Sequence, residues 1–158
     1  GHLDHFGGAA RIKEISGARI GATEADWKMI DEFAKQPAAK AFPFNRAPER
    51  DAKDLILKDG DTVTLGEHTL QVRHCPGHTP GHVVFHSPEM NRAFVGDVLF
   101  AGSIGRTDFP QGDHQQLLDS ITQKLWPLGD DVTFIPGHGP VSTFGEERQT
   151  NPFVRDGA

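Results

Sequence analysis

A chain of 158 residues with 36% hydrophobic and 24% charged residues has the length and composition of a single globular domain. Its formal net charge is −6, whereas proteins that bind nucleic acid or an anionic membrane carry an excess of basic residues. No apolar stretch approaches the length of a membrane span. The 18 glycines and 11 prolines predict many short elements joined by turns, which argues against a plain helical bundle.

The first third of the chain predicts two helices followed by a loop. Apolar residues recur at helical spacing within residues 7–16, and Gly17 then offers a C-terminal stop, so that His5 is expected just before this helix. Thr23 is the expected N-cap of the second helix. Residues 36–50 show no period and are expected to form a loop. The apolar stripe of the second helix consists of Trp27, Ile30 and Ala34, and Pro37 closes it.

The middle of the chain changes to a period of two, which predicts strands. Residues 62–65 and 68–73 alternate around a Gly-Glu pair that suits a two-residue hairpin turn. Residues 81–86 and 92–95 are rich in valine and phenylalanine and predict a second hairpin. Asp97 follows at the exit of its last strand.

The last third predicts a helix, a strand and a short helix. Asp113 can cap a helix with Gln116 three residues on, and this helix ends before Pro127. A buried strand is expected over 132–135, and a final helix over about 144–150. The stripe of the first of these helices is formed by Leu117, Leu118, Ile121 and Leu125.

Histidine and aspartate side chains gather at turns that glycine and proline shape, where a sharp bend exposes the side chain at the rim of a sheet. Imidazole and carboxylate are ligands of divalent metals, and a catalytic metal site needs several of them converging with one position open for water. Each residue alone is ambiguous, whereas the set predicts a metal centre. The candidates are His2, Asp4, His5, His78, Asp97 and His138.

Other histidines and the single cysteine receive plainer interpretations. His74 and His82 flank the expected ligand His78 and could orient it, with a purely structural role as the alternative. Cys75 is interpreted as a small apolar residue at a strand end, with thiolate ligation as the alternative. The remaining isolated histidines, which are interpreted as surface or core residues, include His68, His86 and His114.

Four of these segments together resemble the successive metal motifs of the metallo-β-lactamase superfamily, in the same order. The resemblance implies an α/β (α+β) fold, a four-layer αββα sandwich, in a single domain over 1–158. The superfamily's opening motif is His-x-His-x-Asp-His, so its first histidine and the N-terminal strands of the sandwich are expected before Gly1. The segments are His2-x-Asp4-His5, Pro76-Gly77-His78-Thr79-Pro80-Gly81-His82, Val95-Gly96-Asp97 and Ile135-Pro136-Gly137-His138-Gly139.

The resemblance also implies roles for these residues around two divalent metal ions, with zinc expected and iron or manganese as alternatives. His2 and His78 would join the preceding histidine at one metal, and Asp97 would bridge to the other. Asp4 and Asp97 are the expected catalytic carboxylates, Asp4 by orienting the attacking hydroxide or taking its proton. The second metal would be held by Asp4, His5 and His138.

Within the superfamily, residues 105–110 and 112–114 resemble bacterial type II glyoxalase-like hydrolases, also called hydroxyacylglutathione hydrolases. The implied partner is a small-molecule thioester of the S-lactoylglutathione type, and the implied compartment is the cytoplasm. Arg106 is expected to bind a carboxylate of the substrate, with a structural ion pair as the alternative role. Arg148 and Asn151 are weaker candidates for substrate binding.

Several other functions remain open on the sequence alone. The main alternative is a mononuclear-iron persulfide dioxygenase of the same fold, because the segment 105–109 also resembles that family. The superfamily's β-lactamases and nucleases fit less well, the nucleases because the chain is acidic. A serine hydrolase would use Ser103 in an Ala-x-Ser-x-Gly turn, but no helix is expected after it. A partner-binding fragment without catalysis is the non-enzymatic alternative.

Overall fold

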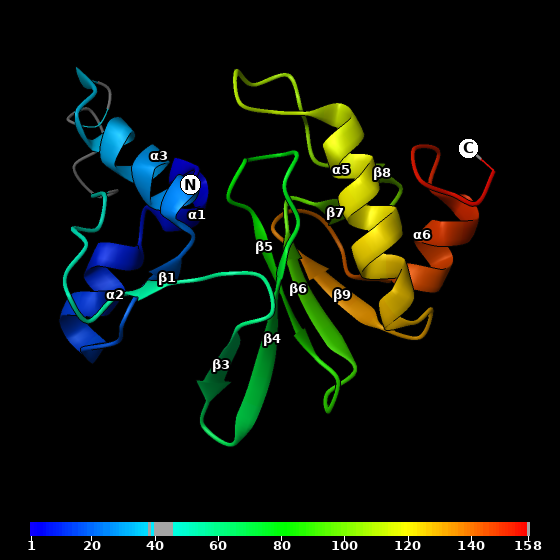
Figure 1. Ribbon diagram of the computed structural model, residues 1–158, viewed down its shortest axis with the longest axis horizontal. Helices are drawn as coiled ribbons and strands as arrows, with labels where there is room; N and C mark the ends of the chain where they lie inside the picture. The colour runs from blue at the N-terminus through cyan, green and yellow to red at the C-terminus, as the bar shows by residue number, and fades with distance from the viewer. Residues whose placement is uncertain (38, 40–45, 158) are drawn as a thin grey trace. The chain divides into compact units, whose positions relative to one another are not determined.

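The structure is a computed structural model that describes residues 1–37, 39 and 46–157. The chain divides into two compact units, a first unit over Gly1–Leu57 and a second unit over Lys58–Ala158, and each is described by itself (Figure 1). Both helices and strands occur, which confirms the expected mixed α/β class. The single domain over 1–158 stays a prediction. Among the described residues, no helix combines the length and the apolar character needed to cross a membrane.

In the part of the first unit that the structure describes, helices lie beside two short parallel strands (Figure 1). Its core is formed by Phe6, Trp27 and Ile30, and partly buried neighbours such as Phe33 pack against them. The rings of Phe6 and Phe33 meet edge to face with centroids 5.6 Å apart. The elements are α1 (Leu3–Phe6), α2 (Ala9–Ser16), β1 (Gly21–Ala22), α3 (Glu24–Ala34) and β2 (Leu55–Ile56).

Both helices predicted for the first unit are confirmed, with differences in detail. α2 ends at Gly17, which has the left-handed φ of 67° expected of a C-terminal glycine. The Thr23 hydroxyl accepts the backbone N–H of Asp26 and so caps α3. Ala34 is exposed, contrary to the expected stripe, because Phe33 reaches the core in its place.

The loop expected over 36–50 is confirmed in part. Residues 46–50 have no regular secondary structure, whereas Pro37 and Ala39 are helical. Residues 38 and 40–45 lie outside the described residues. Proline is well suited to the start of a helix, because its missing N–H is not needed there.

The second unit is built on a six-stranded sheet in the order β10-β9-β6-β5-β4-β3. Its pairs are antiparallel except for β6 and β9, which run parallel. A separate small hairpin, β7–β8, follows β6. The elements are β3 (Thr62–Leu65), β4 (His68–His74), β5 (Val83–Ser87), β6 (Arg92–Gly96), β7 (Leu99–Phe100), β8 (Ser103–Ile104), α5 (His114–Ser120), its π and 3₁₀ continuations (Ile121–Leu125 and Trp126–Leu128), β9 (Thr133–Pro136), β10 (Ser142–Thr143) and α6 (Phe144–Thr150).

The two predicted hairpins and the predicted terminal helix are confirmed. In the first hairpin Leu65 pairs with His68, and the intervening Gly66 has a φ of 60°. In the second, Ser87 pairs with Arg92. Five strands of two residues each went unpredicted, because so short a segment shows no period. They are β1, β2, β7, β8 and β10.

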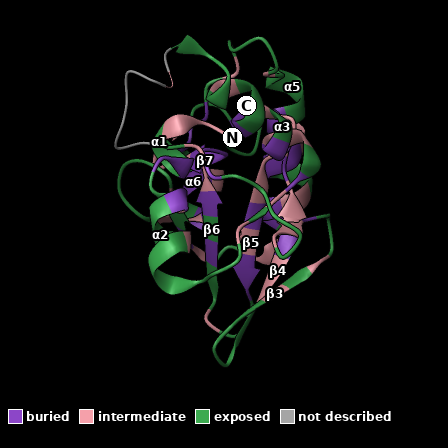
Figure 2. Cartoon of the chain, turned by 90° about the vertical axis from the view of Figure 1, so that its left-hand side faces the viewer, coloured by how far each residue is buried: buried purple, intermediate pink, exposed green. Residues whose placement is uncertain are grey.

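The core of the second unit lies between one face of the sheet and the helices α5 and α6. Val84, Val95 and Phe134 of the sheet form one cluster with the leucine and isoleucine stripe of α5 and its continuation. Figure 2 shows buried residues along β5 and β6, which alternate in β6 with exposed ones. Burying each such side chain contributes about 1.5–3 kcal/mol to folding. The Asp113 carboxylate accepts the N–H of Gln116 at 2.9 Å and caps α5 as predicted.

Candidate metal centre

A tightly bound loop between β4 and β5 carries His78. The preceding Gly77 has a φ of 130°, and a Cβ there would lie 2.4 Å from a backbone nitrogen of α5. The N–H of Asp113 donates to the Gly77 carbonyl at 2.8 Å. The hydroxyl of Ser120 donates to the Pro76 carbonyl at 2.7 Å. Because the loop packs directly on α5, a side chain at position 77 has no room, and the backbone at His78 is fixed.

The His78 imidazole is buried and held by one backbone carbonyl. Its side chain is 4% exposed. Its Nδ1 lies 2.8 Å from the carbonyl oxygen of Arg106, which can only accept, so Nδ1 carries the proton and donates. The ring therefore presents Nε2 for ligation, 3.5 Å from Oδ2 of Asp97.

Asp97 directly follows β6, and the backbone at this point packs against the ring of His82. Gly96 has a φ of 50°, and a Cβ there would meet the ring of His82 at 2.8 Å. The N–H of Asp97 donates to Nε2 of His82 at 3.1 Å. His82 was expected to orient His78; this bond instead fixes the backbone of another candidate ligand, Asp97.

His138 lies in the glycine-rich turn after β9. The N–H of Gly137 donates to the Gly96 carbonyl at 2.8 Å, which ties this turn to the end of β6. The exposed His138 ring meets Phe100 edge to face, with centroids 6.3 Å apart. Its Nε2 lies 3.6 Å from Oδ2 of Asp97. The parallel pairing of β6 with β9 brings these distant segments together.

Three candidate ligands therefore converge in the second unit, with Asp97 between His78 and His138. Ligand atoms about 2.0–2.2 Å from one ion in a tetrahedron lie roughly 3.3–3.6 Å apart. The two nitrogen-to-oxygen distances, 3.5 and 3.6 Å, fit that spacing. The donor set suits zinc, iron or manganese.

The remaining candidates lie in the first unit. Asp4 and His5 belong to α1, a short helix that was not predicted, and His5 precedes α2 as expected. The Nε2 of His5 lies 3.6 Å from Oδ2 of Asp4, and both side chains are exposed. His2 is the half-buried N-cap residue. Because Phe6 turns into the core, α1 presents its polar residues outward.

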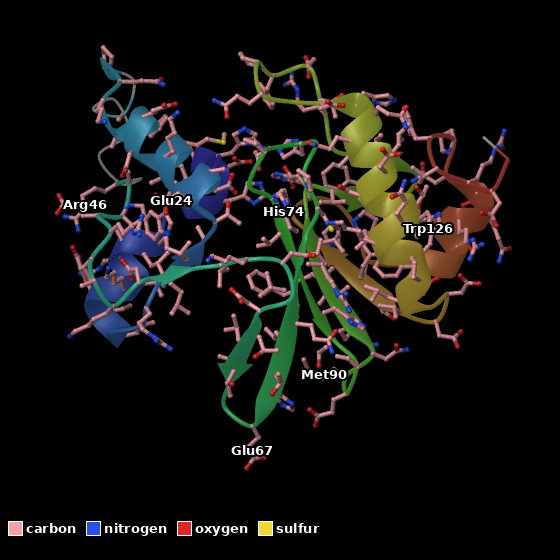
Figure 3. The ribbon with its side chains drawn as sticks, in the orientation of Figure 1. Glu24, Arg46, Glu67, His74, Met90 and Trp126 are labelled. Carbon is pink, nitrogen blue, oxygen red and sulfur yellow. The ribbon has the colours of Figure 1, made fainter. Side chains whose placement is uncertain are left out.

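His74 and Cys75 at the end of β4 play structural parts. Nε2 of His74 lies 2.8 Å from the carbonyl of Pro80, and this bond closes the loop that carries His78 (Figure 3). Burial raises the pKa of the Cys75 thiol to about 12. A fully buried thiol with that pKa stays protonated at neutral pH, which confirms the apolar interpretation.

Arg106 is engaged with its neighbours. Its guanidinium makes two hydrogen bonds to Asp108, at 2.7 and 2.6 Å, and lies 4.3 Å from the centroid of the Phe109 ring. The bond to Arg106 lowers the pKa of Asp108 to about 2. Both charged side chains are exposed. The contacts favour the structural ion pair that was the alternative to substrate binding.

The weaker candidates have structural partners. Arg148 pairs with Asp156 and Asp130 at the surface. Asn151 is fully buried and binds backbone carbonyls, so it is not placed to meet a substrate. Ser103 lies in β8, and the next helix, α5, begins only at His114. The helix that a nucleophile elbow needs immediately after its serine is therefore missing, which removes the basis for a serine nucleophile.

The partners that fix the imidazoles went unpredicted. The carbonyl of Arg106 and the ring of Phe100 leave no signal in a side-chain pattern. Gly105 gives a partial one, since a Cβ there would lie 1.8 Å from the Asp97 carbonyl oxygen. A glycine eight residues after a candidate ligand indicates that another part of the chain packs closely there, but it does not identify that part.

Comparison with known proteins gives one family. The family model of the metallo-beta-lactamase superfamily matches residues 1–138. Hydroxyacylglutathione hydrolase GloC of Haemophilus influenzae is 42% identical over 157 residues, which cover 98% of this chain and 72% of that protein. The mitochondrial persulfide dioxygenase ETHE1 of Homo sapiens is 42% identical over 103 residues, covering 63% of this chain and 41% of that protein.

A solved structure agrees with this family. The crystal structure of TTHA1623 in a di-iron-bound form has a TM-score of 0.82 and 36% identity, and the match covers 97% of this chain and 73% of that one. The metallo-β-lactamase fold expected from the motifs is thereby confirmed.

Proposed function

Since the chain belongs to the metallo-β-lactamase superfamily, we propose that it is a metal-dependent hydrolase that cleaves thioesters of the hydroxyacylglutathione type. The observation that carries the proposal is the carboxylate of Asp97 lying 3.5 Å from Nε2 of His78 and 3.6 Å from Nε2 of His138. The similarity to GloC supports the thioester as substrate.

The proposed ligand set combines the motifs of both units around two divalent ions, with zinc as the first choice. His2 and His78 would hold one ion, Asp97 would bridge, and Asp4, His5 and His138 would hold the other. When bound, such ions lower the pKa of a water molecule and polarise a carbonyl group.

The residues of the chain itself contribute orientation and proton transfer. The bond from Nδ1 of His78 to the Arg106 carbonyl fixes the tautomer that ligation needs. The bond from the Asp97 N–H to His82 holds the backbone of Asp97, whose carboxylate would bridge the two ions. Asp4, exposed on α1, is proposed to take a proton from the attacking water. A thiolate leaves readily, so little general-acid help is required, which fits a chain without tyrosine.

Elemental analysis paired with kinetics tests this proposal. We expect two metal ions per chain and hydrolysis of S-lactoylglutathione that a chelator abolishes. Asp97→Asn should lower kcat by at least about 100-fold, because the amide is a poor bridging ligand. His68→Gln, at an exposed histidine that pairs with Glu89, is the matched control and should keep full activity. Chelator-resistant hydrolysis, or an Asp97→Asn variant as active as the control, would contradict the proposal.

The persulfide dioxygenase is the second candidate, supported by the shorter match to ETHE1. It predicts one iron ion per chain and consumption of oxygen with glutathione persulfide. The hydrolase predicts neither. The same elemental analysis, with an oxygen electrode, distinguishes the two functions.

The compartment and the substrate's carrier remain proposals as well. We propose the cytoplasm, because the single cysteine is buried and suits a reducing compartment. Because Arg106 is paired with Asp108, we propose a range of thioesters broader than those of glutathione. Comparing kcat/KM for glutathione thioesters and for other acyl thiols tests that range.

A further inference from the structure

A buried carboxylate outside the candidate ligand set lies at the centre of α6. Glu147 is 2% exposed. Its Oε2 accepts the N–H of Gly102 at 2.8 Å and the side-chain amide of Asn151 at 2.8 Å, and its Oε1 accepts the hydroxyl of Ser142 at 2.6 Å. All three donors are neutral. A buried charge is costly unless it is fully hydrogen-bonded, and these bonds are of the strong, charge-assisted kind.

The same group holds the β7–β8 hairpin. Gly102 is in the turn of that hairpin and has a φ of 72°. Asn151, itself fully buried, donates to the carbonyl of Ser103 at 3.0 Å and to that of Phe100 at 3.4 Å. Glu147 of α6 and Asn151, the C-cap residue of that helix, therefore bind the turn and both strands. We call Glu147, Asn151 and Ser142 the α6 clasp.

The hairpin is joined to the candidate metal centre at three points. Asp97 lies two residues before β7, and Gly105 after β8 packs so closely that a Cβ there would meet the Asp97 carbonyl oxygen at 1.8 Å. Arg106, the next residue, supplies the carbonyl that holds His78. Phe100 of β7 lies edge to face against the ring of His138. All three candidate ligands of the second unit thus depend on where this hairpin lies.

We propose that Glu147 is a positioning residue: through the α6 clasp it fixes the β7–β8 hairpin, and the hairpin sets the arrangement of His78, Asp97 and His138. This inference rests on the proposed function for its consequence, metal binding. The contacts that place the hairpin are made by the chain itself, so they can be measured in metal-free protein. The carboxylate accepts from all three neighbours, and its charge strengthens each of these bonds.

The test replaces Glu147 with glutamine, which removes the negative charge. Its NH₂ group can face only the Ser142 hydroxyl, which can accept as well as donate, so the bonds from Gly102 and Asn151 lose their charge-assisted strength. In metal-free protein, we expect the Gly102 amide of Glu147→Gln to exchange with solvent at least about tenfold faster, and the His138 ring proton signals to shift as the Phe100 ring moves. Zinc affinity, measured by competition with a chromophoric chelator, should fall by about 10–100-fold. The loss should appear in kcat more than in KM.

Val154→Ala is the matched control. Val154 packs in the core of the second unit near α6 but outside the clasp, so its truncation lowers stability without removing a hydrogen bond. It should lower Tm while leaving zinc affinity and the Gly102 exchange rate within about twofold of the wild type. Should Glu147→Gln fail to fold, Ser142→Ala removes a single donor and should give a smaller shift of the same kind.

Two results would overturn the inference. One is unchanged Gly102 exchange and His138 signals in Glu147→Gln or Ser142→Ala. The other is a loss of zinc affinity in Val154→Ala as large as that in Glu147→Gln, which would assign the effect to general stability. If the wild type binds no metal, the proposed function fails, while the measurements on metal-free protein still decide whether the clasp places the hairpin.

Discussion

Single atoms of the backbone decide how the histidines of the second unit can act. The Arg106 carbonyl sets the tautomer of His78, and the N–H of Asp97 sets that of His82. The first bond leaves Nε2 of His78 for the candidate metal site, and the second uses Nε2 of His82 to hold the backbone of Asp97. The sequence shows that these residues are histidines, but which ring nitrogen carries the proton depends on a neighbour distant in the sequence.

At this scale, the Arg106–Asp108 pair gives a prediction about substrate recognition. Asp108 already engages the Arg106 guanidinium, and an exposed ion pair with a substrate carboxylate would add little binding energy. Arg106→Ala should therefore raise KM only about two- to fivefold for a thioester that bears a carboxylate, and leave KM for a neutral thioester unchanged. Asp108→Asn should lower KM for the charged substrate, since it releases the guanidinium. Steady-state kinetics with both substrates measures this. Equal effects on the two substrates would show that Arg106 only shapes its loop.

His86 predicts a dependence of stability on pH. Burial lowers its pKa below the ordinary 6.5, and the charge of Arg73 lowers it further. The unfolded chain therefore takes up a proton before the folded chain does. The contribution of His86 to the free energy of unfolding is fully present above pH 6.5. It is lost as the pH drops from 6.5 to the pKa of His86 in the folded chain, by at most about 1.4 kcal/mol per pH unit.

Urea unfolding of metal-free protein between pH 7.5 and 5 measures this effect. His86→Gln should show a shallower loss of stability on acidification than the wild type. His68→Gln, at an exposed position, should follow the wild type. Parallel curves for all three proteins would assign the acid sensitivity to other groups.

At the scale of elements, the packing of the His78 loop on α5 gives a stability prediction. Gly77→Ala combines a φ of 130° with a Cβ 2.4 Å from a backbone nitrogen, so we expect a loss of about 2–4 kcal/mol and a lower metal content. Gly66→Ala is the control: its φ of 60° is also left-handed, but no atom lies within 4 Å. It should lose only about 1 kcal/mol.

Urea unfolding and elemental analysis of both variants provide the comparison. Equal losses of stability would show that the loop moves away from α5 without cost. A normal metal content in Gly77→Ala would show that the loop geometry does not control His78.

At the scale of the whole molecule, the proposed ligand set predicts that metal stabilises the chain. Zinc at about 100 times its Kd should add about 2.7 kcal/mol and raise Tm by roughly 5–10 °C. His5→Ala and His138→Ala should each reduce that rise, because both imidazoles are proposed ligands of the same ion. His114→Ala, at an exposed histidine near Thr107, should keep it. Calorimetry with and without zinc measures the shifts, and a full rise in His5→Ala would remove the first unit from the proposed site.

The sequence by itself determined the long elements and the chemistry of the candidate site. The hairpins, α3, α5 and α6 follow from periodicity, caps and glycine turns, which are local properties of the chain. The candidates His78, Asp97 and His138 follow from motifs. Only the tertiary structure decided that Arg106 pairs with Asp108, that Asn151 is buried, and that Glu147 joins α6 to the β7–β8 hairpin. Burial, backbone hydrogen-bonding groups and the pairing of charged side chains decide these contacts, and none of them leaves a periodic trace in the order of side chains.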